Sequence, residues 1–206
     1  LRSSGVVSST QAVQFSGWSI EDGPKTLDQP EMEWETISVL LDQGKTSMAA
    51  HQTRRMSEWY LREACDRLDG KVPFKANSKW HLGDFKAGVL SRYKDLVKKA
   101  KTAEESWGRD TDQVESLEEE LKDIGERLDE DGRALNPNVH YNEDESAFAN
   151  CTAAELEPAL EAYRDLYHLL WCDTCNSCVS IAKEGPKPTT VSCNCSEINM
   201  NLEKKS

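Results

Sequence analysis

Apolar residues recur every three or four positions over much of the chain, the period of helices that bury one face. The clearest run has spacings of 3, 4, 3 and 4, and a second has spacings of 4, 4, 3 and 4. The two runs consist of Val114, Leu117, Leu121, Ile124 and Leu128, and of Phe85, Val89, Tyr93, Leu96 and Ala100. Each run is too short for a free-standing coiled coil. We therefore expect the two to pair as a helical hairpin around residues 83–131.

Three further helices are predicted by apolar stripes that carry start and stop signals. The first is bounded by Pro30 and Gly44, and the second covers residues 46–68. The third opens with the capping box Thr152-Ala-Ala-Glu155 and leads directly into Cys172. Most of the chain is thus expected to form a helical bundle.

Residues 1–19 show an alternating pattern instead, in which Val13 and Phe15 are separated by polar residues. Such alternation is typical of a half-buried strand. One or two short strands do not form a stable sheet alone. We expect them to lie at the edge of a larger sheet, supplied by a missing N-terminal part of the polypeptide.

The predicted fold class is therefore mainly α: a helical bundle or hairpin, one or two short N-terminal strands, and a small C-terminal clasp rich in cysteine. The predicted units are strands and a loop in residues 1–30, a helical domain in 31–150, and a capped helix with a cysteine-rich clasp in 151–206.

Composition and charge exclude some classes of function. No apolar run approaches the roughly 20 residues that a membrane span needs, and the net charge of −12 argues against broad nucleic-acid binding. The charge is uneven, however. Residues 71–101 hold nine basic and two acidic residues, a net of +7, whereas residues 104–130 hold three basic and twelve acidic ones, a net of −9. We expect these segments to lie against each other. A second hypothesis reserves Lys94, Lys98 and Lys99 for nucleic acid.

Five of the seven cysteines lie between residues 172 and 195, as a C-x-x-C and a C-x-C pair joined by a loop with Gly185 and two prolines. An odd number of clustered thiols, in a chain that begins at Leu1 without an export signal, favours a metal site in the reducing cytoplasm over a disulfide framework. Two thiolate pairs suit one tetrahedral zinc ion. The predicted ligands are Cys172, Cys175, Cys193 and Cys195, with Cys178 as an alternative ligand.

A full set of four sulfur ligands leaves no open position for water, so this zinc is expected to be structural. His168, one helical turn before Cys172, could replace one sulfur, although an exposed side chain is the simpler interpretation. A redox C-x-x-C is disfavoured because such motifs sit at helix N-termini, and this one follows a helix C-terminus. His140, in a loop, is the remaining candidate for a base or ligand.

The helix over 46–68 also carries a polar flank: His51, Arg54, Arg55 and Glu58. Arg54 and Glu58, four residues apart, can form an ion pair on a solvated face. The alternative is a polar cluster that contacts a partner domain.

Together, several of these motifs resemble the C-terminal region of SMC/RecF-like ABC-type ATPases of bacterial DNA-repair and phage-defence systems. The order that carries the resemblance is Trp18…Gly23-Pro24, His51-x-x-Arg54-Arg55-x-x-Glu58, Lys71-Val-Pro-Phe74…His81-Leu-Gly-Asp84, Val139-His140, and a capped helix ending in C-x-x-C. The resemblance implies that residues 1–19 are terminal strands of an ATPase head and residues 31–195 a helical appendage. The Walker and signature motifs of such a head are absent from this sequence.

No catalytic motif is visible in the sequence. The first hypothesis is a non-catalytic, zinc-stabilised module of an SMC-like ATPase that contacts the head or other subunits in DNA repair or antiviral defence. The second is a zinc-containing nucleic-acid-binding module that uses the basic face of residues 83–101. A hydrolase with an unrecognised site would need convergent carboxylates or a histidine dyad, and four scattered histidines do not supply one.

Overall fold

The computed structural model describes residues 15–19, 23–26, 30–75, 80–130, 135 and 151–205. Within these ranges the chain is mainly helical. The helices are α1 (Pro30–Asp42), α2 (Thr46–Leu68), α3 (Leu82–Trp107), α4 (Asp112–Glu130) and α5 (Ala153–Leu170). The strands are β1 (Phe15–Ser19), β2 (Gly23–Thr26), β3 (Trp171–Cys172), β4 (Ser177–Cys178), β5 (Ser180–Glu184), β6 (Lys187–Ser192) and β7 (Asn199–Asn201). The predicted fold class, mainly α with short strands and a C-terminal cysteine clasp, is confirmed.

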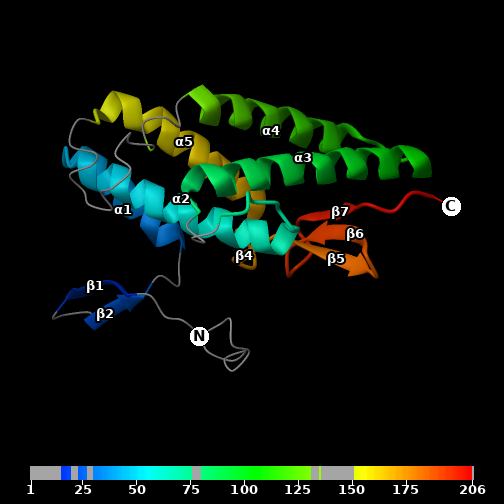
Figure 1. Ribbon diagram of the computed structural model, residues 1–206, viewed down its shortest axis with the longest axis horizontal. Coiled ribbons are helices and arrows are strands. Elements are labelled where there is room, and N and C mark those ends of the chain that lie inside the picture. Colours follow the sequence, from blue (N-terminus) through cyan, green and yellow to red (C-terminus); the bar gives the residue numbers. More distant parts are fainter. Residues whose placement is uncertain are drawn as a thin grey trace.

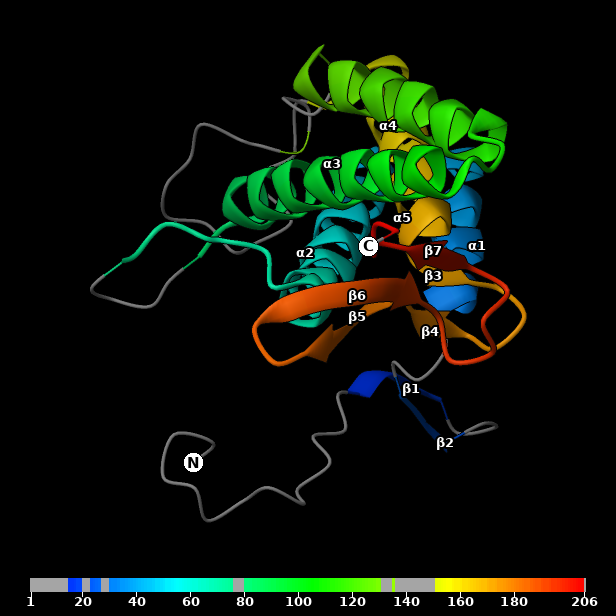
Figure 2. The ribbon, with the colours of Figure 1, turned by 90° about the vertical axis from the view of Figure 1, so that its right-hand side faces the viewer.

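The helices pack as a bundle in which neighbours along the chain are also neighbours in space. α2 contacts α1, α3 and α5, while α4 bridges α3 and α5. Figures 1 and 2 show the α3–α4 pair lying across α2 and α5 as a separate layer. None of the described helices is long and apolar enough to cross a lipid bilayer.

The expected hairpin is formed by α3 and α4, which contact each other along their length. α3 continues past the predicted apolar run, which ends at Ala100, as far as Trp107, and Ala103 extends its buried stripe. Gly108 then ends it with a φ of +66°, and its N–H bonds to the Glu104 carbonyl. Glycine adopts this left-handed conformation without the penalty that a Cβ imposes.

The oppositely charged segments lie against each other across this hairpin, as the sequence predicts. Nζ of Lys101 lies 3.1 Å from a carboxylate oxygen of Glu115, and Nζ of Lys86 lies 2.9 Å from one of Asp129. Both pairs join α3 to α4, so two of the basic residues of α3 are neutralised within the molecule.

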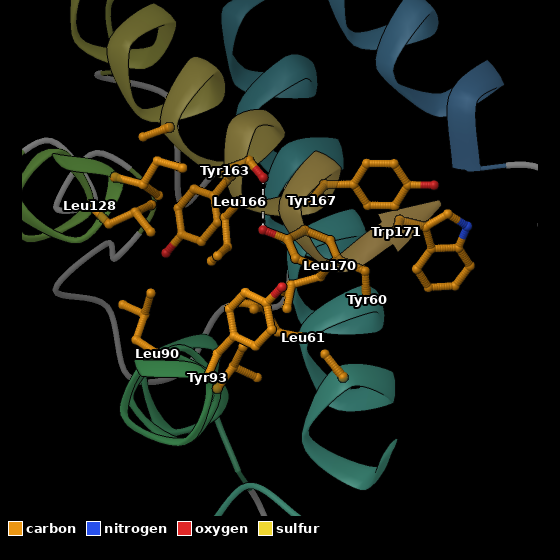
Figure 3. Close-up of a cluster of buried hydrophobic side chains, with 14 of the residues drawn as sticks. Tyr60, Leu61, Leu90, Tyr93, Leu128, Tyr163, Leu166, Tyr167, Leu170 and Trp171 are labelled. Atoms are coloured by element: carbon orange, nitrogen blue, oxygen red, sulfur yellow. Dashed lines mark hydrogen bonds between the residues drawn. The ribbon is translucent and has the colours of Figure 1, made fainter. Parts of the chain in front are cut away.

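Tyrosines from three helices fill the core of the bundle (Figure 3). Tyr60 and Tyr93 are almost fully buried, and their hydroxyls donate to the carbonyls of Tyr163 and Leu169 over 2.8 and 3.2 Å. A buried phenol needs such a partner, because an unpaired hydroxyl in an apolar core is costly. Both acceptors belong to α5, so α5 is fixed from two sides.

The C-terminal strands build on the end of α5. β5, β6 and β7 form a three-stranded antiparallel sheet in the order β5-β6-β7, which contacts α2 through β5 and α3 through β7. The loop expected around Gly185 is therefore wrong in part: residues 180–192 form a β-hairpin that turns at Gly185, with a φ of +61°.

The chain end is held against the far end of α3, as the red segment beside α3 in Figure 1 shows. The indole N–H of Trp107 donates to the Glu203 carbonyl over 2.9 Å, and the Lys205 N–H donates to the Ser106 hydroxyl over 2.8 Å. These two bonds join the sheet to the tip of the helical hairpin.

Candidate metal centre

The first pair of cysteines lies on a tight hairpin at the C-terminus of α5. β3 and β4 pair antiparallel, so Trp171 faces Cys178 and Cys172 faces Ser177. The Val179 N–H closes the hairpin onto the Leu170 carbonyl over 2.8 Å, which satisfies one of the carbonyls that a helix end leaves free.

The turn that carries Cys175 is fixed by Asn176. Asn176 has a φ of +48°, a conformation that asparagine tolerates better than most residues. Its side-chain oxygen accepts a 2.9 Å bond from the indole of Trp171, whose ring stacks on Tyr167 at 5.4 Å between ring centroids. The aromatic core of the bundle thus holds the first cysteine pair in place.

The second pair lies between β6 and β7. The Cys193 N–H bonds to the Ile198 carbonyl over 3.0 Å, and the Ile198 N–H points back at the sulfur of Cys193 over 3.3 Å. A sulfur that accepts a backbone N–H is favoured as a thiolate. This turn presents Cys193 and Cys195 toward the first pair.

The four predicted ligand sulfurs come together: those of Cys172, Cys175, Cys193 and Cys195 all lie within 4.8 Å of one another. The Cys172–Cys195 and Cys193–Cys195 sulfur distances are 3.6 and 3.5 Å. A tetrahedron with metal–sulfur bonds of about 2.3 Å has edges of about 3.8 Å. The residues present therefore fit one tetrahedral metal ion without rearrangement of the backbone.

The site lies at the surface of the molecule, with one side closed. Cys172 and Cys193 are 3% and 4% exposed, Cys175 is half-buried, and Cys195 is exposed. An ion held here would be reached from solvent only past Cys175 and Cys195. No described cysteine forms a disulfide.

The four thiols do not titrate alike. A hydrogen bond with the Ser177 hydroxyl lowers the pKa of Cys175 from 9.0 to about 6. The pKa of Cys195 rises to about 12: the Glu197 backbone bond would lower it, but the side-chain hydrogen bonds with Cys175 and Cys193 raise it further. Four sulfurs this close share protons, because each additional thiolate repels the others. A bound cation removes that repulsion.

Cys178 lies outside the group of four and is buried, with 1% of its surface exposed. Side chains of a strand alternate between its two faces. The pairing of β3 with β4 therefore puts Trp171 and Cys178 on the core side and Cys172 and Ser177 on the side of the sulfur cluster. Burial raises the pKa of Cys178 to about 12, which keeps it a neutral thiol.

The candidate nucleic-acid lysines do not share one environment. Lys98 and Lys99 are exposed on α3. Lys94 is partly buried against α4, where its Nζ lies 3.1 Å from the position that a Cβ on Gly125 would occupy. The structure leaves two of the three predicted lysines facing solvent.

The polar flank of α2 makes contacts within the chain. Arg54 pairs with Glu58 at 3.1 Å and donates to the Leu135 carbonyl over 3.3 Å. Arg55 is exposed, and His51 is half-buried. The ion pair expected at Arg54 and Glu58 is present, and Arg54 also fixes Leu135 in the core.

Of the two candidate histidines, only His168 lies in the part of the chain that the structure describes. His168 is exposed, lies 3.6 Å from a carboxylate oxygen of Asp173, and is not part of the sulfur group. His140 and its loop lie outside the described residues.

Ser177 is the site residue that sequence reasoning missed. Its hydroxyl oxygen lies 3.0 Å from the Cys175 sulfur and accepts a 3.2 Å bond from the Asn194 N–H. The only signal in the sequence is its place two residues after the second cysteine of C-x-x-C, where a serine is unremarkable.

Comparison of the chain with protein-family models, curated proteins and solved structures finds no match. The class that fold and site define is therefore a helical bundle closed at one end by a four-cysteine cluster able to bind a metal ion.

Proposed function

We propose that this chain is a non-catalytic helical module whose C-terminal clasp is held together by one structural zinc ion. The observation that carries the proposal is the convergence of four sulfurs within 4.8 Å from two separate turns. An all-thiolate tetrahedral set selects zinc or an iron–sulfur centre over hard cations such as magnesium. Zinc suits a site that fixes a fold, since it needs no redox change and four ligands exclude a reactive water.

The positions of the four ligands indicate how a bound ion would stabilise the fold. Cys172 lies in β3, directly after the end of α5, whereas Cys193 and Cys195 lie in the turn between β6 and β7. One ion would tie the bundle to the sheet at the point where the chain leaves the bundle. The ion would add to the contacts of β5 with α2 and of β7 with α3, which join the sheet to the bundle elsewhere.

Metal analysis under reducing conditions tests this proposal. We expect one zinc per chain, which is lost in the double variant Cys172→Ser/Cys193→Ser, together with a lower melting temperature. Cys151→Ser is the matched control, because Cys151 is a half-buried thiol outside the group of four. Protein that contains no metal would overturn the proposal, and so would a double variant that keeps its zinc. A coloured protein that contains iron would show that the four cysteines hold an iron centre instead of zinc.

For its context, we propose that the module belongs to an SMC-like ATPase and contacts the ATPase head or another subunit in DNA repair or antiviral defence. The support is the order of sequence motifs, from Trp18 to the C-x-x-C pair. Reading the coding sequence upstream of Leu1 tests it. A P-loop and a Walker B aspartate there would support the proposal, and an unrelated upstream domain would contradict it.

The alternative is a zinc-containing nucleic-acid-binding module that uses the basic face of residues 83–101. It is favoured by the exposure of Lys98 and Lys99. It is weakened by the ion pairs of Lys86 and Lys101 with α4, which neutralise two of the cations of that segment. Phosphate neutralisation by several cations is what gives such proteins their affinity.

A further inference from the structure

We infer that Ser177 is the positioning residue of the clasp: its hydroxyl joins the two cysteine turns and orients the sulfur of Cys175 toward the metal. The inference rests on the proposed metal site and goes beyond it, because Ser177 is not itself a ligand.

With a metal bound, the chemistry of the groups sets the direction of both hydrogen bonds. The Asn194 N–H can only donate, so the Ser177 oxygen accepts it over 3.2 Å. The hydroxyl proton is then free to point at the Cys175 sulfur, 3.0 Å away. A metal-bound cysteine is a thiolate and can only accept. The serine therefore donates to the first turn and accepts from the second.

The position of Ser177 makes this bridge stable. Ser177 is 6% exposed, one of the few buried polar side chains among the described residues. It lies on β4 opposite Cys172, on the same face of the hairpin. Strand pairing thus holds its hydroxyl on the side of the sulfur cluster, next to the Cys175 sulfur and shielded from water.

Two consequences follow for the chemistry of the site. The hydroxyl limits the freedom of the Cys175 side chain, which is otherwise half-buried and on the open side of the cluster. It also withdraws electron density from that sulfur, which makes the metal thiolate a weaker nucleophile. Partners that orient metal ligands in this way are worth about 10–100-fold in metal affinity when removed.

Chelator competition on the full chain tests the inference, with zinc as the metal. We expect Ser177→Ala to bind zinc about 10–100-fold more weakly than wild type, and Ser177→Thr, which keeps the hydroxyl, to stay close to wild type. Ser180→Ala is the matched control, because its hydroxyl bonds to the Ser192 carbonyl in the same region and touches no sulfur. It should leave zinc affinity unchanged.

A second readout separates orientation of the ligand from support of the fold. In zinc-loaded protein, peptide mass spectrometry should show faster iodoacetamide alkylation of Cys175 in Ser177→Ala, while alkylation of Cys151 stays the same. Unchanged affinity and alkylation in Ser177→Ala would overturn the inference while leaving the zinc site intact. So would a Ser177→Ala chain that loses its helical circular dichroism, since the serine would then hold the fold. Wild type without zinc affinity would overturn the metal proposal itself.

Discussion

Gly88 lies near the start of α3, in close contact with the chain around it. We expect the methyl group added by Gly88→Ala to destabilise the fold, although alanine normally stabilises a helix relative to glycine. An ideal Cβ on Gly88 would stand 2.8 Å from the backbone oxygen of Lys71 and 3.2 Å from the sulfur of Cys65. The oxygen belongs to the backbone of the α2–α3 connector and cannot rotate away as a side chain would. The α2–α3 connector can therefore approach α3 this closely only because residue 88 has no side chain.

Two opposing contributions determine the change in the free energy of unfolding on Gly88→Ala. Overpacking by one carbon costs about 1–3 kcal/mol, whereas alanine gains about 1 kcal/mol over glycine inside a helix. We expect Gly88→Ala to lower the free energy of unfolding by about 1 kcal/mol, the difference between the middle of the first range and the second term.

Gly83→Ala is the matched control in the same helix, because nothing lies within 4 Å of its ideal Cβ. We expect it to raise stability by about 0.4–1 kcal/mol. Urea titrations followed by circular dichroism give both values. The reasoning about the close approach would be refuted if Gly88→Ala were as stable as Gly83→Ala.

Two further predictions concern thiol ionisation and nucleic acid. Burial raises the pKa of Cys178 from 9.0 to about 12, so its contribution to stability is complete below pH 9 and is lost as the pH rises toward 12. In urea titrations from pH 9 upward, stability should fall more steeply in wild type than in Cys178→Ala; parallel curves would contradict this. For DNA, fluorescence anisotropy at low salt should show no affinity of the wild-type chain. A salt-dependent affinity that Lys98→Glu/Lys99→Glu abolishes would instead favour the nucleic-acid alternative.

The helical part of the fold could be predicted from sequence because its signals are local. An apolar stripe such as Val114 to Leu128 and a capping box such as Thr152–Glu155 report on neighbouring residues only. The apolar run that predicts α3 ends at Ala100, short of Trp107, because Ala103, the last buried residue of the helix, is small and weakly apolar. Boundaries depend on such marginal residues.

The small sheet could not be predicted because its pairing is not local. β7 adds to β6 by pairing Val191 with Met200, and few residues of these strands are buried. The glycine and prolines near residue 185 favour a loop when strand partners are unknown. The choice between Cys172 and Cys178 also depends on pairing, since only the β3–β4 register shows which one faces the core.

The contact of the chain end with α3 has a consequence for the order in which the molecule assembles. Trp107 bonds to a residue 96 positions away, and Ser106 to one 99 positions away. Contacts between such distant segments form slowly, because the entropy cost of closing a long loop comes before any stabilisation from the contact. The helices can form early from local contacts. The sheet and its sulfur cluster form later, because they need both the hairpin that follows α5 and the C-terminal strands to be in place. Capture of a metal ion would then mark the completion of folding rather than its start.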